Sequence, residues 1–559
     1  MRSFIQLLRE KFLPSHRSQE RSKPRFIRPR LEALEDRLVL DAYTFTGAGD
    51  GVSWFDANNW LNTSNPAIIS VPGAVDSASI GPGFNVAVSG GSAVVNSVSV
   101  TGSSLTVSSS LESNLMTTAA GAPLTVNPGG EVKIDSSAMF SGAVTDTGLI
   151  NANTTNPFTG TTITFAGGAE IGPGDLNGNL AAGPNSNINF TAGGGNVFEA
   201  GATLGMGAGN INVLSTVSIQ GTLNDMTTTM NVMIGGDLSG PGALNEQAIL
   251  NWTGGNISLT GGVDVDVSGQ LNVSGPNGKI LSTSLSLENS GSTIGGTVGL
   301  TMMSGSSITN GTGVETFVSL PGINGMGSGG ITNVAGGLFD INSTTGTTIG
   351  VPFTNEGNLN VLAGSSLTLT SPPMSGTPTI DLDGTIGLDG YLYLNSTATS
   401  DSGFILNHQA GWFDVGISPG MTGTLIVPTG VTDTVEGNLD ITSVGLLTGG
   451  GLVSNTSGRL ELDFGSSTAG LGYYVQGNSG TLAEQVVMGT NAVLRVTGTA
   501  TLSGTLVLLD YVPVVGDSFV VVETGEGLYD HFDTVPDGMV ETNSTYDASV
   551  TQVKPPAGS

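Results

Sequence analysis

The chain has 559 residues and a formal net charge of −30, from 45 Asp and Glu against 15 Lys and Arg. Ten of the 15 basic residues lie within the first 40 positions, so the rest of the chain is strongly acidic and repels nucleic acid, which we exclude as a partner. The chain has no cysteine, which excludes disulfides, thiolate metal sites and a cysteine nucleophile.

Residues 1–42 form a basic segment that we interpret as an export leader. It contains no apolar run of the length that a Sec signal peptide requires, because charged residues or proline interrupt every apolar cluster. On composition alone, a disordered basic tail with two marginal helices fits equally well.

The end of this segment favours the leader. Residues 30–42 resemble the LEPR-XLL motif of exported Planctomycetes proteins, although Asp36 replaces the usual proline and Asp41 replaces a common serine. The resemblance implies an exported, extracellular or cell-surface protein and implies no activity. The positions that carry it are Leu31, Glu32, Leu34, Glu35, Arg37, Leu38 and Leu40.

Residues 43–85 are predicted to cap a repetitive body. Trp54 and Trp60, six residues apart, are followed by Pro72-Gly73 and Asp76, which resembles the opening of many bacterial surface β-helix proteins. Such aromatics could form a binding patch, but we expect the two tryptophans to plug the end of the core.

Residues 86–465 are predicted to form a parallel β-helix. The 87 glycines, the 11% of charged residues and the short alternating apolar runs indicate an all-β chain with tight turns. An apolar-x-Asn frame ends at Asn289, Asn310, Asn333 and Asn355, with spacings of 21, 23 and 22 residues. This period predicts coils of about 22 residues whose corner asparagines bond to one another as a ladder. The alternative is chance recurrence in a low-complexity chain.

A second frame repeats the apolar-Asn-Val pattern at 211–213, 271–273 and 359–361. The last two copies are 88 residues apart, which is four periods of 22. No stretch of about 18 apolar residues occurs, so we predict no transmembrane segment.

Residues 466–553 are predicted to form a separate C-terminal β domain, followed by a tail at 554–559. Alternation is stronger here and the asparagine period is lost, which favours an antiparallel, sandwich-like unit. The strand at 516–522, followed by Asp530-His531-Phe532, resembles the closing segment of autotransporter passenger proteins.

The sequence offers weak candidates for chemistry. No Lys or Arg occurs at 134–278 or 280–458, although β-helix lyases use such residues, so we predict that the chain is not an enzyme. The alternative is a polysaccharide-active lyase or hydrolase with its site near Asp381–Asp389 or His408–Asp414.

Calcium is the one cofactor that the acidic turns suggest. Asp381, Asp383 and Asp389 lie near tight turns and are weak calcium candidates, but an ordinary solvated acidic surface also explains them. We therefore assign no catalytic or cofactor-binding residue. The leading hypothesis is an exported, non-enzymatic β-solenoid that acts as an adhesin-like or envelope-scaffold protein. Its partners would be carbohydrate, other envelope proteins or further copies of itself.

Overall fold

The computed structural model describes residues 40–552, with gaps at 153–159, 174–178, 192–194, 206, 226, 234, 289–290, 314, 327, 371–379, 408–410, 417–421, 470, 489, 513, 538 and 545–546. The described residues from 41 onward form one compact unit. The leader positions Leu31, Glu32, Leu34, Glu35, Arg37 and Leu38 lie outside the described residues, and Leu40 is exposed.

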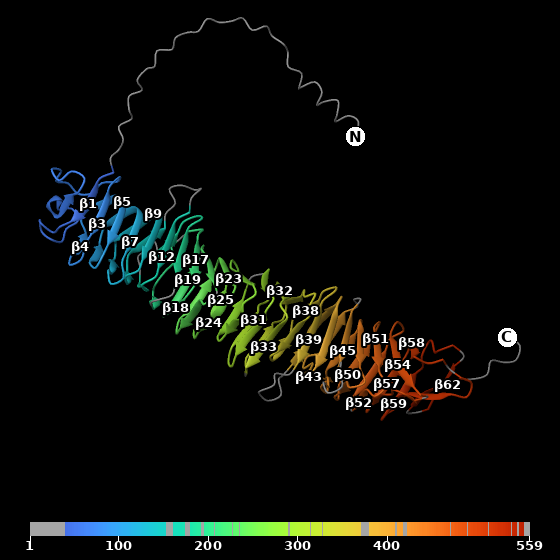
Figure 1. The fold of residues 1–559 in the computed structure, drawn as a ribbon. Helices are drawn as coiled ribbons and strands as arrows, with labels where there is room; N and C mark the ends of the chain where they lie inside the picture. Colours follow the sequence, from blue (N-terminus) through green and yellow to red (C-terminus); the bar gives the residue numbers. More distant parts are fainter. Residues whose placement is uncertain are drawn as a thin grey trace, which may run out of the picture. The chain divides into compact units, whose positions relative to one another are not determined.

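This unit is a parallel β-solenoid of about 18 turns with about 22 residues per coil, which confirms the predicted fold (Figure 1). A typical coil contributes one strand to each of three parallel sheets, which we name sheets A, B and C. Most strands are short because the chain usually turns a corner after three to five residues, commonly at a glycine. The one described helix is the 3-10 turn η1 (Ala57–Asn59).

Sheet A extends through the whole unit. Its strands are β1 (Ala42–Phe45), β2 (Trp60–Asn62), β3 (Ser77–Ile80), β5 (Ser92–Val100), β7 (Ser110–Thr118), β9 (Glu131–Phe140), β11 (Leu149–Ala152), β12 (Thr162–Phe165), β14 (Leu180–Ala182), β15 (Asn187–Phe190), β17 (Asn210–Val213), β20 (Thr229–Val232), β23 (Ile249–Trp252), β26 (Gln270–Val273), β29 (Ser292–Gly295), β32 (Glu315–Ser319), β35 (Leu338–Ile341), β38 (Asn358–Val361), β41 (Gly384–Leu388), β44 (Phe404–Asn407), β47 (Thr432–Val435), β50 (Leu452–Asn455), β53 (Tyr473–Gln476), β57 (Thr499–Leu502) and β60 (Gly527–Asp530).

Sheet B follows sheet A along each coil. Its strands are β4 (Asn85–Val88), β6 (Ser104–Val107), β8 (Leu124–Val126), β10 (Val144–Asp146), β13 (Ala169–Ile171), β16 (Asn196–Phe198), β18 (Thr216–Ile219), β21 (Asp237–Gly240), β24 (Gly255–Leu259), β27 (Lys279–Leu281), β30 (Leu300–Met303), β33 (Gly322–Met326), β36 (Thr347–Gly350), β39 (Ser366–Thr370), β42 (Tyr391–Asn395), β45 (Trp412–Val415), β48 (Asn438–Ile441), β51 (Arg459–Leu462), β54 (Thr481–Val487), β55 (Thr490–Asn491) and β58 (Thr505–Leu509).

Sheet C is separate only from β19 onward. In the first coils the long strands β5, β7 and β9 supply two faces: the first half of β9 pairs with β11 and its second half pairs with β12. The strands of sheet C are β19 (Thr222–Asp225), β22 (Ala243–Glu246), β25 (Val263–Val265), β28 (Ser284–Leu287), β31 (Ser307–Asn310), β34 (Gly330–Asn333), β37 (Phe353–Asn355), β40 (Ile380–Leu382), β43 (Thr397–Thr399), β46 (Thr424–Ile426), β49 (Leu446–Thr448) and β52 (Ser467–Ala469).

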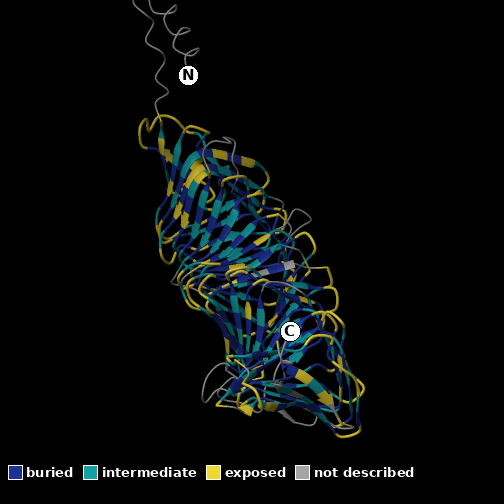
Figure 2. Cartoon of the chain, turned by 90° about the vertical axis from the view of Figure 1, so that its right-hand side faces the viewer, coloured by how far each residue is buried: buried dark blue, intermediate teal, exposed yellow. Residues whose placement is uncertain are grey.

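The core lies inside the coils. Alternate residues of each strand point inward, so one position in successive coils makes an apolar column, while exposed residues gather at the corners (Figure 2). Phe140, Phe165 and Phe190 are aligned in sheet A, with ring centroids 5.5 and 5.2 Å apart. Each coil is therefore stabilised by its two neighbours.

The N-terminal end is closed by residues of the predicted cap. Strand β2 runs antiparallel to β1, and η1 leads into it. Trp54 and Trp60 are 0% and 4% exposed, their rings pack edge to face at 4.8 Å, and Trp60 Nε1 donates to Trp54 O. Both tryptophans thus lie in the core at this end.

At the C-terminal end, parallel stacking continues past residue 465. Strand β53 pairs in parallel with β50 and β57, and β57 pairs in parallel with β60. Among the described residues, the antiparallel pairing expected from residue 466 is limited to the β54–β55 hairpin and to a sheet in which β59 (Ser518–Thr524) and β61 (Met539–Asn543) flank β62 (Asp547–Gln552). In the same sheet, β56 (Leu494–Val496) pairs in parallel with β59.

The difference arises because alternation is the same in parallel and antiparallel strands, so the sequence pattern could not distinguish them. Within the described part of the chain, no helix has the length and apolarity needed to cross a membrane.

Candidate functional site

Three of the four predicted ladder asparagines form a continuous hydrogen-bonded column, which we name the inner ladder. Asn310 Nδ2 donates to Asn333 Oδ1 and Asn333 Nδ2 donates to Asn355 Oδ1, both at 2.7 Å. Asn355 Nδ2 continues the column by donating to the backbone oxygen of Asp383 at 2.6 Å. All three asparagines are 0% exposed and end strands of sheet C.

The pairing of the preceding strand with β31 differs from the sequence frame by two residues. Leu287 is aligned with Asn310 in sheet C, two residues before Asn289, which lies outside the described residues. Leucine and asparagine thus occupy equivalent inward positions in neighbouring coils. Strand pairing, rather than the triplet frame, sets this register.

The inner ladder is a structural feature. Asn333 Nδ2 also donates to Asn358 O at 3.0 Å, which satisfies a corner carbonyl. A Cβ atom on Gly337 would lie 2.5 Å from Asn333 Oδ1, so the corner needs glycine to let the amide approach. The ladder is enclosed and offers no surface for a ligand.

A second ladder, which we name the outer ladder, lies on the outer face of sheet A and includes two copies of the apolar-Asn-Val frame. Each asparagine donates from Nδ2 to the Oδ1 of the asparagine one coil earlier, at 2.7, 2.8, 2.9 and 3.1 Å in chain order. Thr293 closes the row by donating to the last of them at 3.2 Å. The members of the outer ladder are Asn189, Asn212, Asn231, Asn251 and Asn272.

The strongest candidate site is on the outer face of sheet B, where β42, β45, β48 and β51 place two columns side by side. One column is Tyr391, Trp412, Asn438 and Arg459, and the other is Tyr393, Asp414, Asp440 and Glu461. Asp463 follows β51 directly. We name these nine residues the acidic–aromatic face.

Rings and a guanidinium line one side of this face. Tyr391 is 48% exposed, and its ring is nearly parallel to that of Tyr393 at 5.9 Å. The Arg459 guanidinium lies over the Trp412 ring at 5.8 Å, and its Nε bonds to Glu461 Oε2 at 2.8 Å. These contacts fix the rings as a firm platform.

Carboxylates crowd the other side. Asp440, Glu461 and Asp463 each offer an oxygen within 4.8 Å of the other two. Burial raises the pKa of Asp440 to about 8, with further contributions from the charges of Asp463, Asp414 and Glu461. Burial, then the charges of Asp463 and Glu461, raises the pKa of Asp414 to about 6.

The chemistry of this face follows from these groups. Asp440 Oδ1 is buried and has no hydrogen-bond partner among the described residues. The close oxygens of Asp440, Glu461 and Asp463 are a donor set that could hold a divalent cation. Ionised carboxylates also accept hydrogen bonds from hydroxyl groups, and the rings offer stacking surfaces.

The predicted calcium residues are only partly brought together. Asp381 lies on β40 and Asp383 follows it, and burial, with smaller contributions from the charges of Asp383 and Asp401, raises the pKa of Asp381 to about 6. Asp383 Oδ1 accepts from Ser402 N. Asp389 lies apart, at the turn between β41 and β42. His408 lies outside the described residues, whereas Asp414 belongs to the acidic–aromatic face.

Sequence reasoning missed Asp440 and Glu461. Their signal is an acid between two apolar residues, Leu439-Asp440-Ile441 and Leu460-Glu461-Leu462, which repeats Phe413-Asp414-Val415. The pattern predicts an outward acid at the same position of each strand. Aligning these triplets would have found the column.

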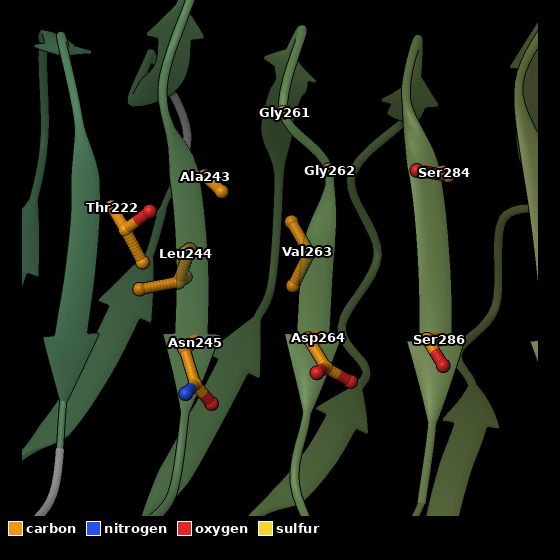
Figure 3. Close-up of a pocket in the computed structure, with 10 residues that line it drawn as sticks. All are labelled: Thr222, Ala243, Leu244, Asn245, Gly261, Gly262, Val263, Asp264, Ser284 and Ser286. Carbon is orange, nitrogen blue, oxygen red and sulfur yellow. The ribbon is translucent and has the colours of Figure 1, made fainter.

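A hollow on sheet C is a weaker candidate (Figure 3). It forms where Gly261, Gly262 and Ala243 leave space beside the aligned polar row Asn245, Asp264 and Ser286. Burial, and the charge of Asp266, raise the pKa of Asp264. The row is polar, but it has no aromatic or basic group among its lining residues.

No protein-family model matches the chain, and a search of curated proteins found no significant match.

Proposed function

We propose that the protein is an exported, non-enzymatic β-solenoid that acts as a cell-surface or envelope scaffold and holds carbohydrate along its outer faces. The observation that carries this proposal is the acidic–aromatic face, where aligned rings and carboxylates repeat over successive coils. Export is supported by the LEPR-XLL-like leader.

The acidic–aromatic face suits an extended sugar chain. Tyr391 and Trp412 lie one above the other along the coil stack, so successive sugars could place their apolar faces on successive rings. Asp414, Asp440 and Glu461 lie beside the rings and accept bonds from sugar hydroxyls. Four carboxyl groups, of which Asp440 is protonated at neutral pH, against one arginine favour neutral or amino sugars over polyuronic acids.

The outer ladder extends this surface with uncharged groups. Each central amide, such as Asn231, uses one N–H and one oxygen lone pair within the ladder. One N–H and one lone pair remain for a ligand or for water. Because the backbone of sheet A fixes their spacing, these amides form a rigid polar surface.

Binding is tested by pull-down of the full chain with insoluble cellulose and chitin, with polygalacturonate as the anionic comparison. We expect retention on a neutral or amino-sugar polymer that falls at least tenfold in the Tyr391→Ala/Trp412→Ala variant. Tyr473→Ala, which removes an exposed ring on sheet A, is the matched control and should bind normally. No retention on any polymer would refute the carbohydrate role.

Export is tested separately in cells that express the full chain. Surface labelling and fractionation should find the protein outside the cytoplasm, and replacing Arg37 and Leu38 together should retain it inside. Cytoplasmic protein in both cases would refute the assignment.

One observation favours a polysaccharide-active enzyme as the second candidate. Asp440 has a raised pKa and lies between Asp414 and Glu461, so a protonated acid stands beside carboxylates, as in glycoside hydrolysis. A reducing-end assay over the same polymers separates the two functions. If the wild type releases reducing ends and Asp440→Asn, Asp414→Asn or Asp383→Asn does not, the protein is a polysaccharide-active enzyme.

A further inference from the structure

Two carboxyl groups are enclosed inside the solenoid in neighbouring coils. Asp225 ends β19 and Glu246 ends β22, and the two residues are aligned in this parallel pair. Both point inward together with the aligned Leu223 and Leu244, and both are 0% exposed. Two ionised carboxylates in such an interior would be very costly, so the pair needs a neutralising partner.

The hydrogen bonds account for only half of the carboxyl oxygens. Asp225 Oδ1 accepts from Thr228 N at 3.0 Å and from Thr228 Oγ1 at 2.5 Å, and Glu246 Oε1 accepts from Ala248 N at 2.9 Å. Asp225 Oδ2 and Glu246 Oε2 are buried and have no partner among the described residues. Two acceptors can bond to each other only when one of them carries a proton.

We infer that Asp225 and Glu246 share one proton, held in a hydrogen bond from Glu246 Oε2 to Asp225 Oδ2 that joins the two coils. One proton satisfies both unpartnered oxygens and removes one of the two buried charges. Asp225 keeps the negative charge because it receives two donors from Thr228, whereas Glu246 receives one from Ala248. Burial, with the charge of Asp225, raises the pKa of Glu246 to about 9, and burial also raises the pKa of Asp225.

The other charged groups of these coils are engaged elsewhere. Val265 follows Glu246 in the inward column of sheet C, and Asp264 points outward beside it. The charge of Asp266 acts on Asp264. On sheet B, Asp237 accepts from Asn256 N at 2.9 Å. Asp225 is the charged residue whose field raises the pKa of Glu246.

The shared proton lies where sheet C ends, before the strands that carry the outer ladder. Asp225 precedes β20, which carries Asn231, and Glu246 precedes β23, which carries Asn251. The hydrogen bond therefore fixes the two corners from which neighbouring rungs of the outer ladder begin. This inference concerns the fold and does not depend on carbohydrate binding.

Glu246→Gln tests the inference because glutamine has the shape of a protonated glutamic acid: its oxygen can still accept from Ala248 N and its amide can donate to Asp225. In the wild type, the folded pKa of about 9 exceeds the ordinary value of 4.5. The stability that the protonated Glu246 gives the folded state is therefore complete below pH 4.5 and is lost as pH rises to about 9. The local unfolding constant should rise up to about tenfold per pH unit in that window, and Glu246→Gln should remove this dependence.

The test compares the hydrogen-exchange protection of residues 243–252 in the wild type and in the variants. It is measured on the full chain from pH 5 to pH 9. Asp264→Asn, an exposed charge removed one coil later, should keep the wild-type dependence. Glu246→Leu should be less protected than Glu246→Gln at pH 7, because Asp225 Oδ2 loses its donor. The infrared band of a protonated carboxyl at pH 7 should weaken in Glu246→Gln. The same pH dependence in wild type and Glu246→Gln, or an unchanged infrared band, would overturn the inference.

Discussion

The inner ladder makes a sharp prediction for Asn333→Ala. The change removes the donor to Asn355 Oδ1 and a donor to Asn358 O, while Asn310 Nδ2 keeps its bond to Leu338 O at 3.0 Å. One buried acceptor therefore loses its partner, and a carbonyl loses one of its bonds. Each buried group left without a hydrogen-bond partner costs about 1–3 kcal/mol, so we expect the free energy of unfolding to fall by about 3 kcal/mol.

Asn251→Ala in the outer ladder is the matched control. Its amide makes two bonds within the ladder, at 2.9 and 3.1 Å, but it lies on the outer face of sheet A, where water can replace them. We expect this variant to cost about 0.5–1 kcal/mol.

Hydrogen exchange resolved by coil is the suitable assay, because coils that contact only their neighbours need not unfold in one step. Protection should fall by about two orders of magnitude at residues 330–361 in Asn333→Ala, and by less than one order around Asn251 in the control. Equal losses of protection in the two variants would refute the argument that burial makes the inner ladder contribute more to stability than the outer ladder.

Three further predictions concern the cap and the acidic–aromatic face. Trp54→Ala should lower the free energy of unfolding by about 4 kcal/mol and expose the first coils to protease, because Trp54 is fully buried against Trp60. A proteolysis pattern like that of the wild type would contradict this prediction. The folded pKa of Asp440, about 8, exceeds its ordinary value of 3.8, so the stability that its protonated form gives the fold is lost as pH rises from about 4 to about 8. Asp440→Asn should therefore flatten the dependence of the melting temperature on pH in this range. A pH dependence equal to that of the wild type would exclude the raised pKa. Trp412→Ala alone should weaken glycan retention about tenfold with an unchanged melting temperature, and retention equal to wild type would exclude Trp412 from the binding platform.

The sequence predicted the solenoid because its period is set by stacking. Equivalent corner positions, such as those of Asn310 and Asn333, are one coil apart, and the alternation of apolar residues shows which side chains point inward. At Leu287 the frame is two residues out of register with the strand pairing, because leucine and asparagine are both accommodated at that inward position.

The candidate site was harder to predict. Asp414 and Asp440 are 26 residues apart, whereas Asp440 and Glu461 are 21 apart, so a fixed period does not align them. Their proximity depends on the pairing of β45 with β48, which aligns Asp414 with Asp440 although this coil is longer than the next. The raised pKa of Asp440 arises from burial and neighbouring charges, and both are properties of the assembled face.

The parallel stacking of the coils also has a mechanical consequence. The hydrogen bonds between coils run along the direction in which a pull on the two ends would act, so tension loads them one coil at a time. The chain would then peel from an end in steps of one coil, about 22 residues each. At about 3.4 Å per residue, each step releases about 75 Å of chain. The two asparagine ladders add hydrogen bonds between coils in the middle of the stack. These coils would therefore unfold under tension after the coils at the ends.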